Sequence, residues 1–280
     1  MTLAAGAAAA SRPLDLLAAE SGVAEKIGLQ LYSLRADLPK DVPGTLARVR
    51  ELGIVEVEGA GLWGLTAEQL RAELDKAGLR CRATHMGLDR LKDDLPGAIA
   101  EAKTVGASWV VCPWLPHEDS FDRDDVMRAA EVFNVAGPAL QKEEMQLGYH
   151  CHGYEFVPSD EGTLFDTLAQ STEAATLKFE IDVFWARAGG VDPTALVEKY
   201  SGRVPLLHLK DMQKGLELPP GSSRAPHETN VVIGTGQIDF PALLRAAEAG
   251  GGELYYIEDE SPKPWDQLPG SLSYLRGLKL

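Results

Sequence analysis

Short apolar segments alternate along the chain with segments whose apolar residues recur at the spacing of a helix. The apolar segments are rich in Val, Ile, Leu and aromatic residues, which is typical of buried strands. We predict eight strands, at residues 27–33, 54–58, 79–85, 108–113, 147–152, 176–182, 203–209 and 253–258. We predict a helix after each of them, at residues 43–52, 66–77, 93–105, 122–145, 162–170, 192–200, 239–249 and 265–278.

Capping residues support these boundaries, most clearly for the second helix. Thr66 begins it and Gln69 follows three residues later, which is the pattern of a capping box. Gly78 stands directly after its last predicted residue, where a left-handed terminator is common. The long segment 212–236 is rich in Gly, Pro and Ser and is predicted to be irregular.

Strict alternation of strands and helices predicts a parallel sheet with right-handed crossovers. Eight such units in about 250 residues favour a closed (β/α)8 TIM barrel, a single α/β domain, here over residues 26–280. The alanine-rich residues 1–25 are expected to form a flexible or helical arm, with a signal peptide only weakly indicated. An open doubly wound sheet is the alternative, but it needs a glycine-rich turn where Tyr32–Arg35 stand.

Composition and charge argue against two classes of partner, nucleic acids and membranes, and indicate the location of the chain. The 280 residues carry 27 Lys+Arg against 42 Asp+Glu, a formal net charge of −15, which argues against nucleic acid. No run of 18 apolar residues is present, so we expect no transmembrane helix and no membrane partner. Three widely spaced cysteines indicate neither a disulfide framework nor a cysteine zinc site, which favours a reducing, cytoplasmic location.

Polar residues gather where the predicted strands end. They are Glu58, His85, His150, His152, Asp182, His208 and Glu258. In a parallel barrel all these ends lie on the face that carries active sites, so we predict one shared pocket.

The fifth strand brings two histidines and a nearby acid to this face. Strand alternation points His150 and His152 the same way, and Glu155 lies on the following loop. Alone, these histidines could be satisfied core residues. Beside Asp182, His208 and Glu258 they indicate a metal, because neighbouring buried carboxylates need a counter-charge. One imidazole and three carboxylates suit Mn²⁺, Mg²⁺, Co²⁺ or Zn²⁺.

Six segments together carry a resemblance to a known family. They are IGLQLYSLR at 27–35, HxHxxEF at 150–156, DVFW at 182–185, HLKD at 208–211, GTGQIDFPALL at 234–244 and YIEDE at 256–260. With them the sequence resembles the sugar phosphate isomerase/epimerase family of xylose isomerase-like TIM barrels, from about residue 27 to the end.

The resemblance implies one divalent metal ion held by the residues that match the family's ligands. These are Glu155, Asp182, His208 and Glu258. A ligand from His150 or His152 in place of Glu155 is the alternative, and Glu260 competes with Glu258 because the two share strand parity.

The resemblance further implies an isomerase or epimerase acting on a small keto-sugar, polyol or inosose. The metal would chelate the carbonyl oxygen and a neighbouring hydroxyl and stabilise the cis-enediolate formed on proton loss. Glu155 and Glu258 are the expected acid and base. A homodimer is common in the family.

Other residues are expected to contact the substrate. His150, His152 and Lys210 would bind its hydroxyls or relay a proton, although Lys210 could instead pair internally with Glu180 or Asp211. The residues expected on the far side of the pocket and in its apolar wall are Glu58, His85, Trp114 and Trp185. Trp109, inside the fourth strand, is expected in the core.

Three further functions are considered. A metal-dependent lyase or dehydratase could use the same enolate on a keto-sugar or inosose. Hydrolysis of DNA phosphodiesters is known on related barrels, but it needs more histidine ligands and a basic groove. A sugar-binding barrel without turnover is the alternative outside the enzymes, and the complete ligand set argues against it.

Overall fold

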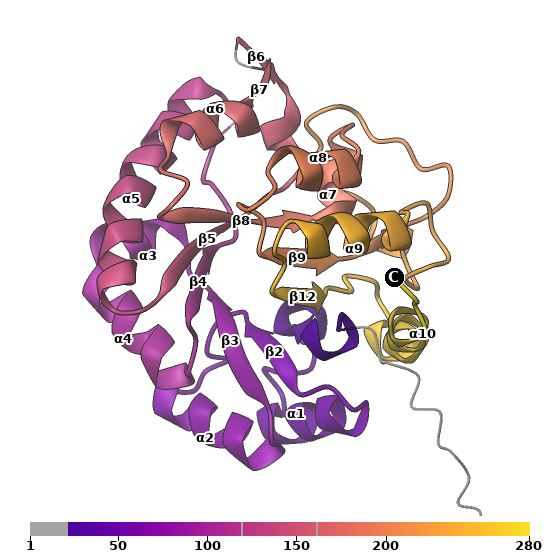
Figure 1. Ribbon diagram of the computed structural model, residues 1–280. Helices are drawn as coiled ribbons and strands as arrows, with labels where there is room; N and C mark the ends of the chain where they lie inside the picture. The colour runs from indigo at the N-terminus through magenta and orange to yellow at the C-terminus, as the bar shows by residue number, and fades with distance from the viewer. Residues whose placement is uncertain (1–21, 119, 161) are drawn as a thin grey trace, which may run out of the picture.

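The computed structural model describes residues 22–118, 120–160 and 162–280. Eight parallel strands form a closed barrel in the order β1, β12, β9, β8, β5, β4, β3, β2. Their bounds are β1 Ile27–Gln30, β2 Glu56–Gly59, β3 Arg80–His85, β4 Trp109–Cys112, β5 Gln146–His150, β8 Leu177–Asp182, β9 Leu206–Leu209 and β12 Leu254–Ile257. The strand β1 pairs with both β2 and β12, which closes the barrel (Figure 1). The TIM barrel fold is confirmed, and each predicted strand overlaps an observed one.

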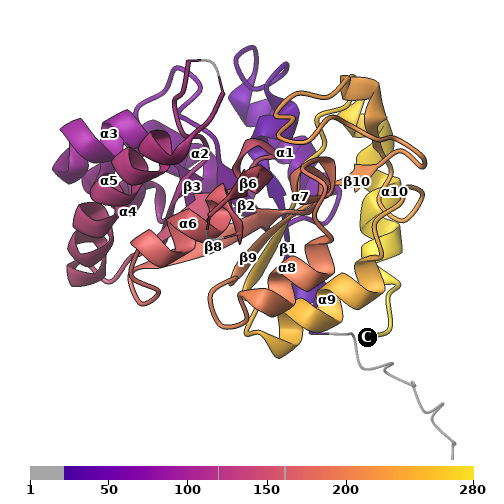
Figure 2. The ribbon, with the colours of Figure 1, turned by 90° about the horizontal axis from the view of Figure 1, so that it is seen from above.

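Helices surround the barrel, and α5 and α10 lie on opposite sides of it in both views (Figures 1 and 2). The predicted helices correspond to α1 Val42–Glu51, α2 Ala67–Ala77, α4 Leu95–Val105, α5 Arg123–Lys142, α6 Leu164–Ser171, α8 Pro193–Lys199, α9 Phe240–Ala249 and α10 Pro264–Arg276. The capping box of α2 forms between Thr66 and Gln69, and Gly78 ends the helix at φ 69°. Across the described residues, no helix has the length and apolar character needed to cross a membrane.

Two short helices were not predicted, α3 Leu88–Asp93 and α7 Val183–Ala188. The apolar residues after Asp182 continue the pattern of the strand, but the Asp182 carboxylate caps α7 by accepting a hydrogen bond from the Trp185 amide. The chain therefore turns into a helix directly at the end of β8. Asp94 divides the connection between β3 and β4 into two helices, because it both ends α3 and caps α4.

The loops contain several short elements. They are the 3-10 segments η1 Ala24–Lys26, η2 Leu31–Leu34, η3 Tyr154–Phe156 and η4 His227–Thr229, and the paired strands β6 Pro158–Ser159 with β7 Gly162–Thr163 and β10 Asp211–Met212 with β11 Asn230–Val231. The segment 212–236, predicted to be irregular, thus contains η4 and β11. Of the predicted arm 1–25, residues 1–21 lie outside the described residues.

The described residues form three buried apolar clusters: a large one that includes residues of the helices and the sheet, a smaller one inside the barrel, and a third around Phe184 and Trp185. The inner core consists of Ala83, Trp109, Val111, Leu206, Leu254 and Tyr256, which confirms the core position predicted for Trp109. Alternate residues of a strand face the same side. Two residues beyond Ala83, Leu206 and Tyr256 stand His85, His208 and Glu258. The apolar layer inside the barrel is therefore followed by a polar layer at the carboxyl ends of the strands.

Candidate metal centre

Four side chains from four neighbouring strand ends meet in the polar layer, and we call them the outer cluster: His150, Asp182, His208 and Glu258. One ligand atom from each lies within 4.8 Å of all the others, and all four residues are buried. His208 Nδ1 lies 3.2 Å from Glu258 Oε2 and 3.9 Å from Asp182 Oδ2. His150 Nε2 lies 3.4 Å from Asp182 Oδ2. Three of the four predicted metal ligands thus lie together.

Two atoms of the outer cluster suit a cation. Within the described part of the chain, His150 Nε2 and Asp182 Oδ2 are buried and make no hydrogen bond, although Lys210 Nζ lies 3.1 Å from Asp182 Oδ2 as an ion-pair partner. Unsatisfied hydrogen-bonding capacity is costly in a buried site, and metal coordination is one way to satisfy it. Two imidazoles and two carboxylates also form a common donor set for a divalent transition metal. The residues therefore fit the metal that the sequence predicted.

Lys210 lies beside the same carboxylates. Its Nζ is 2.7 Å from Glu258 Oε2, 3.1 Å from Asp182 Oδ2 and 2.8 Å from Glu260 Oε2. These are its ion-pair partners, rather than Glu180 or Asp211, the internal partners considered from the sequence. Burial disfavours the ammonium, but Asp182, Glu258 and Glu260 raise the pKa of Lys210 well above its ordinary value. Lys210 is a permanent positive charge at the edge of the outer cluster.

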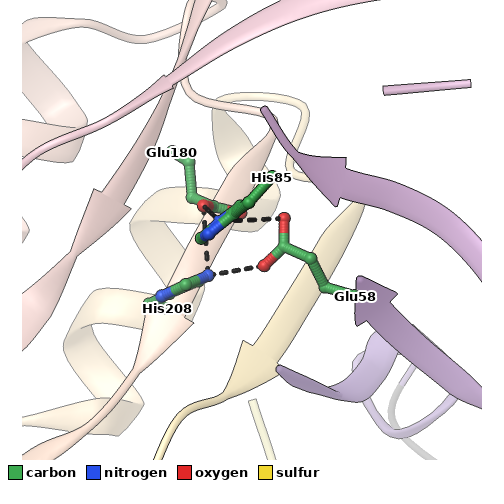
Figure 3. A group of neighbouring side chains, drawn as sticks. All are labelled: Glu58, His85, Glu180 and His208. Atoms are coloured by element: carbon green, nitrogen blue, oxygen red, sulfur yellow. Dashed lines mark hydrogen bonds and ion pairs between the residues drawn. The ribbon is translucent and has the colours of Figure 1, made fainter. Parts of the chain in front are cut away.

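A second group shares His208 with the first. We call it the inner cluster: Glu58, His85, Glu180 and His208, from β2, β3, β8 and β9 (Figure 3). His208 Nε2 lies 2.6 Å from Glu58 Oε2 and 3.0 Å from Glu180 Oε2. His85 Nε2 lies 3.2 Å from Glu180 Oε2 and 3.5 Å from Glu58 Oε1. Each imidazole therefore lies between the same two carboxylates.

Charges of opposite sign balance one another across the two clusters. Burial alone would lower the pKa of His208, but Glu180, Glu258 and Glu58 raise it well above its ordinary value. Burial alone would raise the pKa of Glu258, but Lys210 and His208 lower it well below its ordinary value. Glu58 differs, because burial and the neighbouring Glu180 both raise its pKa. His208 and Lys210 are therefore the positive charges that stabilise the anionic forms of Glu180, Asp182 and Glu258.

Glu155, an expected metal ligand and acid–base residue, lies outside both clusters. It lies in η3, where its carboxylate accepts hydrogen bonds from the Tyr149 hydroxyl and, at 2.9 and 3.1 Å, from the His152 amide. Burial raises the pKa of Glu155 to about 7, although these hydrogen bonds oppose the shift. Both oxygens are thus occupied by the chain around Glu155, and the strand-five place in the outer cluster belongs to His150.

A cavity of about 480 Å³ opens above the outer cluster, and several predicted contact residues line it. Its lining consists of Tyr32, Ala60, His85, Gly87, Pro113, Trp114, His150, His152, Trp185, Glu258 and Glu260. The edge of the Trp114 ring packs against His152, with centroids 4.9 Å apart. Burial, followed by the charge of His150, lowers the pKa of His152 well below its ordinary value, so this imidazole is neutral. Glu58 lies beneath the cavity and is fully buried.

Glu180 and Gln30 belong to the polar layer but were absent from the predicted site. Glu180 shares strand parity with Asp182, two residues later, and that period was the signal that could have found it. Gln30 is the last residue of β1 and donates a hydrogen bond to Glu58 Oε2 at 2.7 Å. Because the first strand was predicted to continue to residue 33, Gln30 did not stand at a predicted strand end.

A closed (β/α)8 barrel with histidines and carboxylates gathered at the carboxyl ends of its strands defines an α/β-barrel protein with a candidate catalytic metal centre. The chain belongs to the xylose isomerase-like TIM barrel family, whose model matches residues 46–278. This confirms the resemblance found in the sequence.

Individual relatives agree with this family. An inosose dehydratase of Geobacillus kaustophilus (strain HTA426) is 26% identical over 244 residues, which cover 73% of this chain and 72% of the relative. A sugar phosphate isomerase/epimerase of Parabacteroides distasonis ATCC 8503 is 26% identical, with a TM-score of 0.75 over 95% of this chain and 98% of the other. The IOLI protein, whose structure holds a zinc atom, has a TM-score of 0.67 at 14% identity, over 90% of this chain and 95% of the other. Proteins similar to this chain thus include an inosose dehydratase and a sugar phosphate isomerase/epimerase.

Proposed function

We propose that this chain is a divalent-metal-dependent isomerase or epimerase that removes a proton next to the carbonyl of a keto-sugar or inosose. The observation that carries the proposal is the convergence of four buried side chains, His150, Asp182, His208 and Glu258, each with one ligand atom within 4.8 Å of the others. These four residues would hold the ion. A divalent ion there would polarise the substrate carbonyl and lower the pKa of the neighbouring C–H. Manganese, magnesium, cobalt and zinc all suit the donor set.

Two cavity-lining groups would move the proton. Glu258 lies at the end of β12, and its anionic form, favoured by Lys210 and His208, can accept a proton. The ring of His152 also lines the cavity, and its Nδ1 has no hydrogen-bond partner among the described residues. We propose Glu258 as the base, with His152 in the place that the sequence assigned to Glu155.

The remaining lining suits a polyhydroxylated ligand. Tyr32 and Trp114 are 42% and 37% exposed, and both line the cavity, so their ring faces can pack against the apolar face of a sugar. Trp185 packs at the cavity wall next to His152, with ring centroids 5.6 Å apart. Glu260, held by Lys210, can accept hydrogen bonds from substrate hydroxyls.

A dehydratase is the second candidate, and the similarity to inosose dehydratase favours it. The first step is the same, because both reactions begin with removal of the proton next to the carbonyl. The two reactions differ in their second step. Return of a proton gives an isomer or epimer, whereas loss of a neighbouring hydroxyl gives an unsaturated ketone and water.

The first prediction tests both candidates in one experiment. The chain with Mn²⁺ is incubated in deuterated water with a panel of keto-sugars and inososes, followed by proton NMR and mass spectrometry. We expect exchange of the proton next to the carbonyl for at least one substrate. A product of unchanged formula, apart from deuterium, identifies an isomerase or epimerase, and loss of water identifies a dehydratase.

Asp182→Asn supplies the control, because it removes a proposed ligand while keeping the size of the side chain. Exchange that continues unchanged in this variant would contradict the proposed metal centre. Absence of exchange with every substrate of the panel would contradict the proposed reaction.

A further inference from the structure

His208 presents its two ring nitrogens to different surroundings. Nε2 faces Glu58 and Glu180 of the inner cluster, and Nδ1 faces Glu258 and Asp182 of the outer cluster. A neutral imidazole carries a proton on one nitrogen and a lone pair on the other, and only the lone pair can bind a metal. The side of the barrel on which His208 can serve as a ligand therefore depends on its tautomer.

A chain of hydrogen bonds beginning at the backbone positions the carboxylate that faces His208 Nε2. The Tyr32 amide donates to Gln30 Oε1 at 2.9 Å, which fixes the orientation of the Gln30 amide. Gln30 Nε2 must then be the donor to Glu58 Oε2, at 2.7 Å. The same oxygen lies 2.6 Å from His208 Nε2, and Glu180 Oε2 lies 3.0 Å from that nitrogen. Carboxylates thus lie at both ring nitrogens, but those at Nε2 are nearer, at 2.6 and 3.0 Å against 3.2 and 3.9 Å at Nδ1. Nε2 is therefore the nitrogen that keeps its proton when Nδ1 gives up its own to a metal.

We propose that Glu58 and Glu180 are positioning residues, which hold the proton on His208 Nε2 so that the Nδ1 lone pair points into the outer cluster. There Nδ1 lies 3.2 Å from Glu258 Oε2 and 3.9 Å from Asp182 Oδ2. In the cationic ring Nδ1 also carries a proton, and a metal ion between Nδ1 and these carboxylates would replace it. The donor arrangement at Nε2 thus leaves Nδ1 as the nitrogen that can bind a metal. This inference rests on the proposed function.

The same arrangement argues against a second metal in the inner cluster. An ion held by all four residues there would need the lone pair of His208 on Nε2, which a neutral imidazole cannot offer while Nδ1 binds an ion in the outer cluster. Glu58 and Glu180 are fully buried and do not line the cavity, whereas His150 and Glu258 do. These two carboxylates therefore act on the metal centre through His208. Carboxylates that orient a ligand histidine commonly change metal affinity 10- to 100-fold when they are removed.

The test, our second prediction, separates hydrogen bonding from charge. Glu58→Met with Glu180→Met removes both acceptors, and we expect zinc affinity to fall about 10- to 100-fold in a competition titration with a chelating dye. Glu58→Gln with Glu180→Gln removes both charges but keeps an amide oxygen in each position, and we expect most of the affinity to remain. Glu56→Met is the matched control, because Glu56 is equally buried in β2 but pairs with Arg82.

A second measurement reads the tautomer itself and does not depend on activity. Long-range proton–nitrogen NMR of histidine-labelled, zinc-loaded wild type should show His208 bound through Nδ1 with its proton on Nε2. Binding through Nε2 would overturn the inference. So would equal affinity losses in the two double variants, or a double Met variant that binds as tightly as wild type. If the wild type binds no zinc at all, the proposed metal centre fails together with this inference.

Discussion

Glu155 and Glu180 show how the role of a residue depends on the atoms that surround it. Both are buried glutamates near strand ends, but Glu155 is bound by the Tyr149 hydroxyl and the His152 amide, whereas Glu180 reaches two imidazoles of the inner cluster. Burial raises the pKa of Glu155, and the histidines lower that of Glu180 although burial opposes them. Residue type and chain position alone do not distinguish these two environments.

The third prediction concerns Glu155. Its pKa is raised to about 7, so between about pH 4.5 and 7 the folded chain keeps a proton that the unfolded chain has lost. Stability of the wild type relative to Glu155→Gln should therefore fall as pH rises through this range, by roughly 3 kcal/mol at about 1.4 kcal/mol per pKa unit. Urea unfolding at a series of pH values measures this difference.

Glu131→Gln, at an exposed position of α5, controls for the loss of one negative charge. Parallel stability curves for wild type and Glu155→Gln would contradict the shifted pKa. Loss of metal binding in Glu155→Gln would instead restore Glu155 to the ligand set.

At the scale of elements, the loop between β9 and α9 depends on a single carboxylate. Asp211 accepts hydrogen bonds from the amides of Met212, Gly234, Gly236 and Ile238, at 2.8 to 3.2 Å. A Cβ at Gly236 would lie 2.2 Å from Asp211 Oδ1, so only glycine lets the backbone approach this closely. The segments HLKD and GTGQIDF of the family resemblance are thus partners across one loop.

The fourth prediction follows from this anchor. In Asp211→Asn one of the two oxygens becomes an amide nitrogen that cannot accept, so two of the four backbone amides lose their partner. We expect the free energy of unfolding to fall by about 2 kcal/mol. We also expect hydrogen exchange of one pair of these amides to become at least tenfold faster. Exchange measured by NMR tests this. Asp266→Asn, at an exposed position of α10, is the control, and unchanged exchange in the loop would refute the anchor.

The whole molecule depends on closure of the barrel at β1. Gly28 pairs with Tyr256 of β12 on one side and Glu56 of β2 on the other. A Cβ at this position would lie 2.7 Å from the Tyr256 ring and 2.8 Å from the Glu56 carbonyl oxygen. Because backbone on the neighbouring strand cannot move without opening the sheet, the space inside the barrel requires glycine here.

The fifth prediction is that Gly28→Ala destabilises the chain by about 1 to 3 kcal/mol through overpacking. Denaturant unfolding measures it. Gly87→Ala is the control, since its Cβ would meet no atom within 4 Å. We expect this substitution to lower the free energy of unfolding by less than Gly28→Ala does. Equal stabilities for wild type and Gly28→Ala would show that the barrel closes more loosely than these distances indicate.

The alternation of apolar segments and helical patterns was sufficient to predict the barrel and all eight of its strands. Such patterns are local, since strand burial and helix periodicity repeat within a few residues of the chain. The same logic located the polar strand ends, including Asp182, His208 and Glu258. The two short helices α3 and α7 were not predicted, because their sequence signals overlap those of neighbouring elements. Asp182, for example, both ends β8 and caps α7.

By itself, then, the sequence determined the fold, the face that carries the candidate site and most of the residues on it. Only the tertiary structure decided that His150 rather than Glu155 stands beside Asp182, that Lys210 pairs with three acids, and that Glu58 and Glu180 face one nitrogen of His208. The physical reason is that hydrogen bonding and charge balance depend on distances between atoms from different strands. Up to 150 residues separate these partners in the chain.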